Sequence, residues 1–197
     1  MRRRLAVGAG IAALALAGPA SAHVGTGLAG GFGAGFVHPL SGADHLLAMV
    51  SVGLWGAILG RPLVYVLPVA FPAMMVAGAI LGMFGAPLPP VELGVALSAL
   101  VLGGCVALAV RAPVWLATAM AAAFAVFHGY AHGRELPSAA DPVGYSAGFV
   151  LATGLLHLAG VGIGAFSRWP AGLTATRALG GGVAVAGVWF LYRAAGA

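Results

Sequence analysis

Apolar residues run in long unbroken stretches along most of this chain, and short segments rich in Gly, Pro or Arg separate them. Crossing a hydrocarbon core of about 30 Å takes about 20 helical residues. After residue 22 the chain has six stretches of that length. The pattern predicts an all-α membrane protein, a six-transmembrane-helix bundle over residues 23–197. The expected spans are 36–60, 62–84, 90–110, 113–132, 142–166 and 171–192.

The first 22 residues follow a different pattern. Basic residues occupy Arg2 to Arg4, a short apolar stretch follows, and the segment ends in Ala20, Ser21 and Ala22. A basic head, a short apolar core and an A-x-A end are typical of a secretory signal peptide. We therefore expect residues 1–22 to be a cleaved signal peptide, which makes His23 the mature N-terminus. An uncleaved anchor helix is the alternative.

Composition excludes several classes of protein. A hydrophobic share of 61% with only 7% charged residues lies outside the range of water-soluble domains. The net charge is +5, but three of the nine basic residues lie at positions 2–4, so no basic stripe could follow a row of phosphates. We expect no nucleic-acid partner. A single cysteine excludes an intrachain disulfide and a cysteine-based metal cluster.

Small and helix-breaking residues suggest how the spans pack. The chain has 33 glycines, which in a bilayer let helix backbones approach closely. We expect contact faces at Gly103 with Gly104 and at Gly180–Gly182. Pro68 and Pro72, within the second span, are expected to kink it and to free carbonyl groups that neighbouring helices must satisfy.

Arginines dominate alternate connections, namely those that carry Arg61, Arg111 and Arg168. The positive-inside rule places these connections in the cytoplasm. Both termini of the mature chain are then outside, and an export signal requires the same orientation. We expect a multi-pass protein of the bacterial inner membrane with periplasmic termini.

Ionisable side chains are costly within a membrane and mark functional sites. Here they form two clusters, in HPLSGADH of the first span and in FHGYAHGRELP of the fourth. The expected topology brings both clusters toward the outer face, where they could meet and hold a divalent cation. The candidate ligands of these clusters are His38, Asp44, His45, His128, His132 and Glu135.

Spacing assigns different parts to these residues. His128 and His132 lie four apart, so their rings share one helix face at about 6 Å between Cβ atoms, which suits one metal ion. Pro39 disfavours helical geometry at His38, so we expect the helix to begin at or just after Pro39, with a bend there that brings His38 closer to His45.

Each carboxylate of the two clusters has more than one interpretation. Asp44 is a ligand, an acceptor that fixes the His45 tautomer, or a local cap. Glu135 is expected just past the helix, as an oxygen ligand, as a partner of Arg134, or as a solvated loop acid.

Three further residues are weaker candidates. His23 could chelate a metal through its amine and ring, or be a mobile terminus. Glu92 could join the outer site, or serve only as an acid in the first turn of a helix. His157, deeper in the fifth span, could be a second station for an ion, or a neutral histidine hydrogen-bonded to a neighbouring helix.

The two histidine motifs, the signal peptide and the six spans together resemble the HupE/UreJ family, associated with hydrogenase and urease maturation, over essentially the whole mature chain. The resemblance implies a secondary nickel permease, with cobalt as a second candidate substrate. The family's metal motifs fall on the six residues of the two clusters. Nickel chaperones or maturation factors in the cytoplasm are the implied partners, besides the metal ion and membrane lipid.

The residues themselves are less specific than the resemblance. Imidazoles with carboxylates suit Ni²⁺, Co²⁺ or Zn²⁺, and no nucleotide-binding loop for ATP-driven pumping is present. We expect a transporter rather than an enzyme, with no organic cofactor. An intramembrane zinc-dependent hydrolase could use the same side chains. A haem bundle fits less well, because His128 and His132 lie on one helix. A purely structural partner would leave the ionisable clusters unexplained. The sequence leaves the oligomeric state open.

Overall fold

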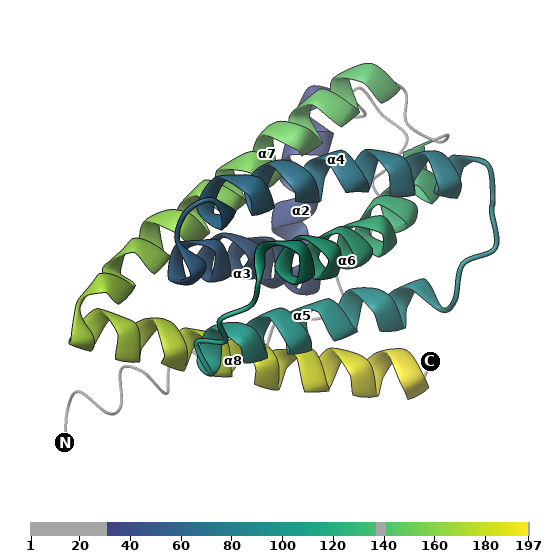
Figure 1. Cartoon of the computed structure of the whole chain (residues 1–197). Coiled ribbons are helices and arrows are strands. Elements are labelled where there is room, and N and C mark those ends of the chain that lie inside the picture. Colours follow the sequence, from purple (N-terminus) through teal and green to yellow (C-terminus); the bar gives the residue numbers. More distant parts are fainter. Residues whose placement is uncertain (1–30, 137–140, 197) are drawn as a thin grey trace, which may run out of the picture.

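The computed structural model describes residues 31–136 and 141–196, and this part of the chain is built of helices (Figure 1). The predicted signal peptide and His23 lie outside the described residues. Each expected span coincides with one helix, except the first, which is divided in two. The helices are α2 (Phe32–Ser41), α3 (Ala43–Leu59), α4 (Leu63–Met83), α5 (Val91–Ala107), α6 (Val114–Glu135), α7 (Pro142–Gly164), which continues as a 3-10 turn (Ala165–Arg168), and α8 (Pro170–Gly196).

The all-α class is confirmed for the described residues, whereas the six-span count stays a prediction. Four helices, α4, α6, α7 with its 3-10 turn, and α8, are long and apolar enough to cross a membrane. The number of candidate spans rises to five if α2 and α3 together count as one broken span. Helix α5 has 17 residues, which at 1.5 Å per residue is only about 25 Å.

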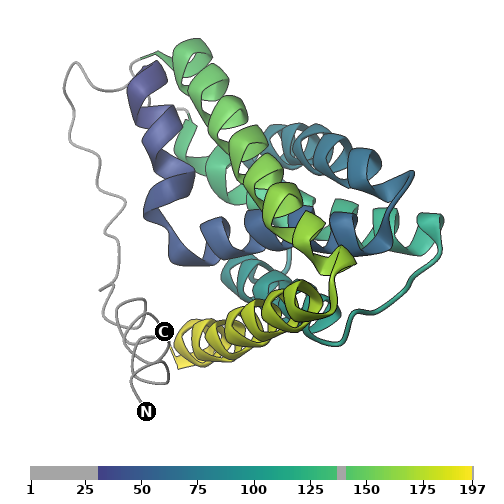
Figure 2. The same ribbon diagram turned by 90° about the vertical axis from the view of Figure 1, so that its left-hand side faces the viewer.

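A sharp corner divides the first predicted span (Figure 2). Helices α2 and α3 meet at 84°, and the break is Gly42, with extended backbone angles of −92° and 112°. The expectation that the helix begins at Pro39 was wrong, because His38 and Pro39 both lie inside α2. Proline only biases the residue before it away from helical geometry. The expected bend between His38 and His45 is therefore present, but it lies at Gly42, three residues after Pro39.

Glycines set the distances between neighbouring helices. Helix α4 lies beside α6, α5 beside α8, and α7 crosses α2 and α3 (Figure 1). A Cβ atom on Gly78 of α4 would clash with the backbone of Val126 on α6, and one on Gly129 of α6 would clash with that of Met75 on α4. Bare backbone surfaces thus touch, as expected where packing rather than water exclusion holds helices together.

The predicted contact faces were partly right. Gly103 of α5 and Gly180 of α8 face each other's backbone. Gly104, Gly181 and Gly182 have no neighbouring atom within 4 Å of an added Cβ. Only Gly103 in the first run and Gly180 in the second lie on the face where α5 and α8 meet. Successive residues of a helix point about 100° apart, so their neighbours face elsewhere.

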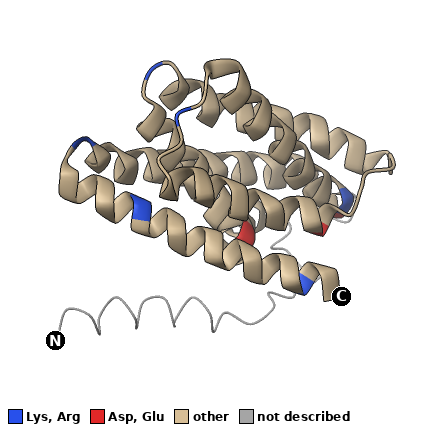
Figure 3. Ribbon diagram, turned by 60° about the horizontal axis from the view of Figure 1, so that its bottom comes forward, with Lys and Arg blue, Asp and Glu red and all other residues tan. Residues whose placement is uncertain are grey.

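Charge is distributed unevenly between the two ends of the bundle. Figure 3 shows most of the arginines at the end where α3, α5 and α7 finish. One of them, Arg177 at the start of α8, donates from Nε to the carbonyl of Ala107 at the end of α5, at 2.7 Å. The end with many arginines is the one that the positive-inside rule assigns to the cytoplasm.

Replacing Gly78 with alanine should destabilise the bundle. The added methyl group must displace the α6 backbone, and overpacking of this kind costs about 1–3 kcal/mol. Gly104→Ala is the matched control, because its methyl group enters open space. Thermal unfolding of the two variants in detergent measures the difference. A Gly78→Ala variant as stable as Gly104→Ala would contradict this account of helix packing.

Candidate metal site

Four histidine rings from α2, α3 and α6 lie in a row. The ring centroids are 4.8 Å apart for His38 and His132, 4.7 Å for His132 and His45, and 4.7 Å for His45 and His128. His45 on α3 thus touches both histidines of α6. The structure brings the two sequence clusters together, because the corner at Gly42 turns α2 back toward the end of α6. We call His38, His132, His45 and His128 the histidine row.

The histidine row runs from the surface into the bundle. At its outer end the Glu135 side chain is 47% exposed and that of His38 is 15% exposed. The His132 side chain is 8% exposed, and His128 is fully buried. The His45 side chain, between His132 and His128 in the row, is 15% exposed, so burial is complete only at His128.

The outer end of the row brings three candidate ligand atoms close together. Glu135 Oε2 lies 3.3 Å from His38 Nε2 and 3.8 Å from His132 Nδ1. One ligand atom from each of these three residues lies within 4.8 Å of the others. The expectation that Glu135 follows the helix was wrong, because it is the last residue of α6. It lies one turn beyond His132, on the same face.

Asp44 selects the tautomer of His45. Its Oδ1 lies 2.9 Å from His45 Nδ1 and accepts the backbone N–H of His45 at 2.8 Å. A carboxylate only accepts hydrogen bonds, so Nδ1 carries the proton and Nε2 keeps its lone pair. His45 Nε2 is buried and has no hydrogen-bond partner. Of the roles considered for Asp44, the geometry supports the acceptor that orients an imidazole.

Ser98 on α5 does the same for His128 by a different route. Its hydroxyl group donates its only proton to the carbonyl of Val95, at 2.6 Å, and lies 2.8 Å from His128 Nε2. The hydroxyl oxygen must therefore accept, and Nε2 carries the proton. The lone pair of a neutral His128 ring is then on Nδ1, which is buried and has no hydrogen-bond partner.

The inner part of the row thus offers several buried nitrogen atoms without partners. They are His45 Nε2, His128 Nδ1 and both ring nitrogens of His132. Leaving such an atom unsatisfied in a low-dielectric interior costs about 1–3 kcal/mol, so their concentration in one place indicates a ligand. Imidazole lone pairs with a carboxylate at the entrance suit first-row divalent cations better than Mg²⁺ or Ca²⁺.

The structure places the weaker candidates elsewhere. Glu92 is exposed in the first turn of α5, and within 31–136 and 141–196 no hydrogen bond or ion pair joins it to the histidine row. His157 on α7 is fully buried and does not belong to the row. The Phe71 ring contacts both the row and His157, at 5.6 Å from the His128 ring and 5.3 Å from the His157 ring.

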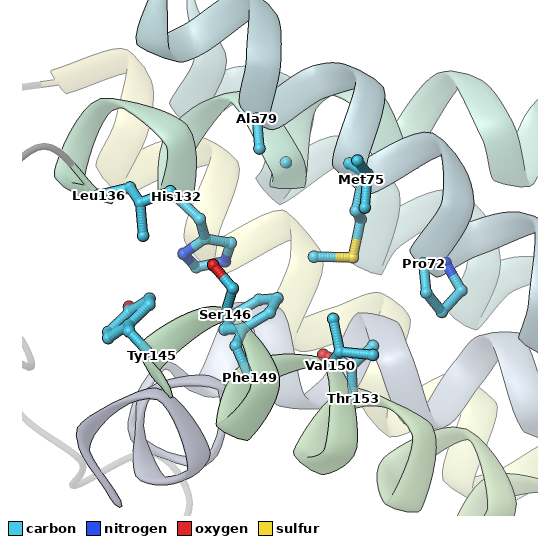
Figure 4. A pocket seen from close by; sticks show the side chains of 12 residues that line it. Pro72, Met75, Ala79, His132, Leu136, Tyr145, Ser146, Phe149, Val150 and Thr153 are labelled. Atoms are coloured by element: carbon cyan, nitrogen blue, oxygen red, sulfur yellow. The ribbon is translucent and has the colours of Figure 1, made fainter. Parts of the chain in front are cut away.

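A cavity of about 80 Å³ adjoins the row between α4, α6 and α7 (Figure 4). His132 lines it from α6 and Met75 from α4, while Tyr145, Phe149 and Thr153 line it from α7. Most of its lining is apolar. A cavity of this size has room for water or for a small ion.

Comparison with known proteins decides the family. The sequence model of the HupE/UreJ protein family matches residues 11–190. The chain belongs to this family. It is 45% identical to Protein HupE of Rhizobium leguminosarum bv. viciae over 181 residues, which are 92% of this chain and 94% of that protein. No solved structure matches the chain.

The recognition of the HupE/UreJ family from the two histidine motifs is thus confirmed. Sequence reasoning nevertheless missed Ser98 and Phe71, which touch the row from α5 and α4. A hydroxyl group in the middle of an apolar span was a visible signal for Ser98. Phe71 gave none, because an aromatic residue in a membrane helix is ordinary packing.

Replacing Ser98 with alanine should weaken binding of Co²⁺ or Ni²⁺ by about 10-fold, the size of effect known for residues that orient a metal-binding histidine. The variant leaves His128 Nε2 without its acceptor and lets the ring adopt the other tautomer. Ser51→Ala is the matched control, since Ser51 is equally buried and its hydroxyl group has no partner. Equilibrium dialysis of purified protein measures both affinities, and equal affinities would contradict the tautomer assignment.

Proposed function

We propose that this HupE/UreJ protein is a secondary transporter that carries Ni²⁺, and also Co²⁺, across the bacterial inner membrane. The observation that carries the proposal is the histidine row, in which lone-pair nitrogens succeed one another from an exposed carboxylate to a fully buried ring. An entrance of this kind replaces hydration water by protein ligands step by step, which lowers the cost of dehydrating a dication.

The direction of transport follows from the two ends of the bundle. The histidine row lies at the end opposite the arginines of the α3–α4, α5–α6 and α7–α8 connections. With those connections in the cytoplasm, the row opens outward and the metal moves inward. Both termini are then periplasmic, after removal of a signal peptide over residues 1–22.

The driving force does not come from ATP, since the chain has no nucleotide-binding loop. A negative-inside membrane potential favours entry of a dication by about 4.6 kcal/mol per 100 mV, twice the value for a single charge. Exchange against protons is the alternative source of energy. In the cytoplasm the metal passes to nickel chaperones or to the maturation factors of hydrogenase or urease.

A zinc-dependent hydrolase, which the same side chains also allowed, gains no support from the family match or from the curated relative. The family membership favours a transport or accessory function instead.

Uptake of radioactive nickel into proteoliposomes tests the proposal directly. His45→Ala and His132→Ala should each lower the initial rate at least about 10-fold, because each removes a ligand from the row. Asp141→Asn is the control: Asp141 caps α7 by accepting the backbone N–H of Gly144, and asparagine caps equally well. Undiminished uptake by both alanine variants would contradict the proposed roles of His45 and His132 as ligands.

Acidification should weaken nickel binding to the purified protein. A free imidazole titrates near pH 6.5, and only its neutral form has a lone pair for the metal. Burial disfavours the charged form of a ring, so affinity should be full down to about pH 6.5 and fall as the pH is lowered further toward about 4. Equilibrium binding at fixed free nickel, without a membrane gradient, separates this effect from any coupling to protons. A flat profile over this range would argue against histidine ligation.

A further inference from the structure

His157 is a second kind of polar site, deeper in the bundle. The residue is fully buried on α7, and neither ring nitrogen has a hydrogen-bond partner among the described residues. One turn away on the same face of α7, the hydroxyl group of Thr153 is also fully buried and without a partner. A hydrogen bond to the Pro68 carbonyl group of α4 would occupy one ring nitrogen only, so the lone-pair nitrogen stays available to a ligand.

Two features connect His157 with the histidine row. The Phe71 ring contacts both His128, at the buried end of the row, and His157. The cavity of Figure 4 is lined by His132 of the row and by Thr153, which is one turn from His157. For an ion at the inner end of the row, His157 is thus a neighbouring imidazole, and the Phe71 ring contacts both sites.

Helix α4 is weakened on both sides of that ring. Pro68 and Pro72 lie inside α4, three residues before and one residue after Phe71. Each lacks the N–H that would bond the carbonyl four residues earlier, so Pro68 O loses the donor that residue 72 would provide. This carbonyl lies next to the His157 ring. A helix with two missing bonds can shift Phe71 at a lower cost than an intact one.

We propose that His157 is an inner relay ligand for the transported dication, separated from the histidine row by a movable Phe71 ring. This inference rests on the proposed transport function and extends it beyond the outer site. The Thr153 hydroxyl group and the Pro68 carbonyl group provide the neighbouring oxygen atoms. One neutral nitrogen and two neutral oxygens bind a dication weakly, and weak binding at an inner station allows release toward the cytoplasm.

The first experiment separates binding at the row from passage beyond it. Nickel binding to purified protein and nickel uptake into proteoliposomes are measured for the wild-type protein and for His157→Leu. We expect the leucine variant to retain the nickel affinity of the row within about 2-fold, and its maximal uptake rate to fall at least about 10-fold. A packing role would be preserved by leucine, so a wild-type uptake rate in this variant overturns the relay.

The second experiment detects the ligand itself. Cys105 is the lone cysteine, so Cys105→Ala provides a thiol-free background. In that background His157→Cys should show a thiolate-to-cobalt charge-transfer band when Co²⁺ is added, and should transport faster than His157→Ser. The serine variant, of nearly the same size, is the control for packing. Cobalt bound at the row with no such band overturns the assignment.

The two experiments also separate this inference from the proposed function. Absence of nickel uptake by the wild-type protein overturns the transport proposal, while the cobalt spectrum still tests the ligand. If His157→Leu fails to fold, as loss of nickel binding at the row would reveal, the comparison of cysteine with serine decides the question. Normal uptake by the wild-type protein with no cobalt–thiolate band contradicts the relay alone.

Discussion

A buried imidazole lone pair without a partner is the constraint around which this protein is organised. In water such a nitrogen is hydrogen-bonded at no cost, but in an apolar interior its desolvation is not repaid. Here His45 and His128 have one such nitrogen each, and on His132 both the lone-pair nitrogen and the N–H lack a hydrogen-bond partner. The same helices that bury them also supply Asp44 and Ser98, which fix the opposite nitrogens of His45 and His128. The cost is concentrated at the points where a metal ion would remove it.

The helix packing serves this arrangement. Side chains at the α4–α6 contact would push the two backbones apart. Gly78, Gly129 and Gly133 have no side chain there, so the helices can approach closely. Gly129 and Gly133 each follow a histidine of the row, so the residues that bring α4 close to α6 lie next to those that bind. Close packing without large side chains gives the rings fixed positions in a region where the hydrophobic effect contributes little to helix association.

The row and His157 differ in what their surroundings allow. At the entrance, Glu135 supplies charge and remains in contact with water. The oxygen atoms of Thr153 and Pro68 near His157 are neutral, and the Phe71 ring contacts both His157 and the row. In the proposed transport function, a strong outer site and a weak inner one would combine capture with release, which a single tight site could not.

The sequence by itself determined the helical class, the helix positions to within a few residues at most ends, the family, and the six residues of the two clusters. These follow from local rules, since apolar length predicts spans and spacing of four predicts a shared helix face. Tertiary structure decided which glycine makes the corner, that Glu135 belongs to α6, and that Ser98 and Phe71 touch the row. Such contacts join helices distant along the chain, and the crossing geometry that creates them depends on backbone approach at particular glycines, which no local pattern specifies.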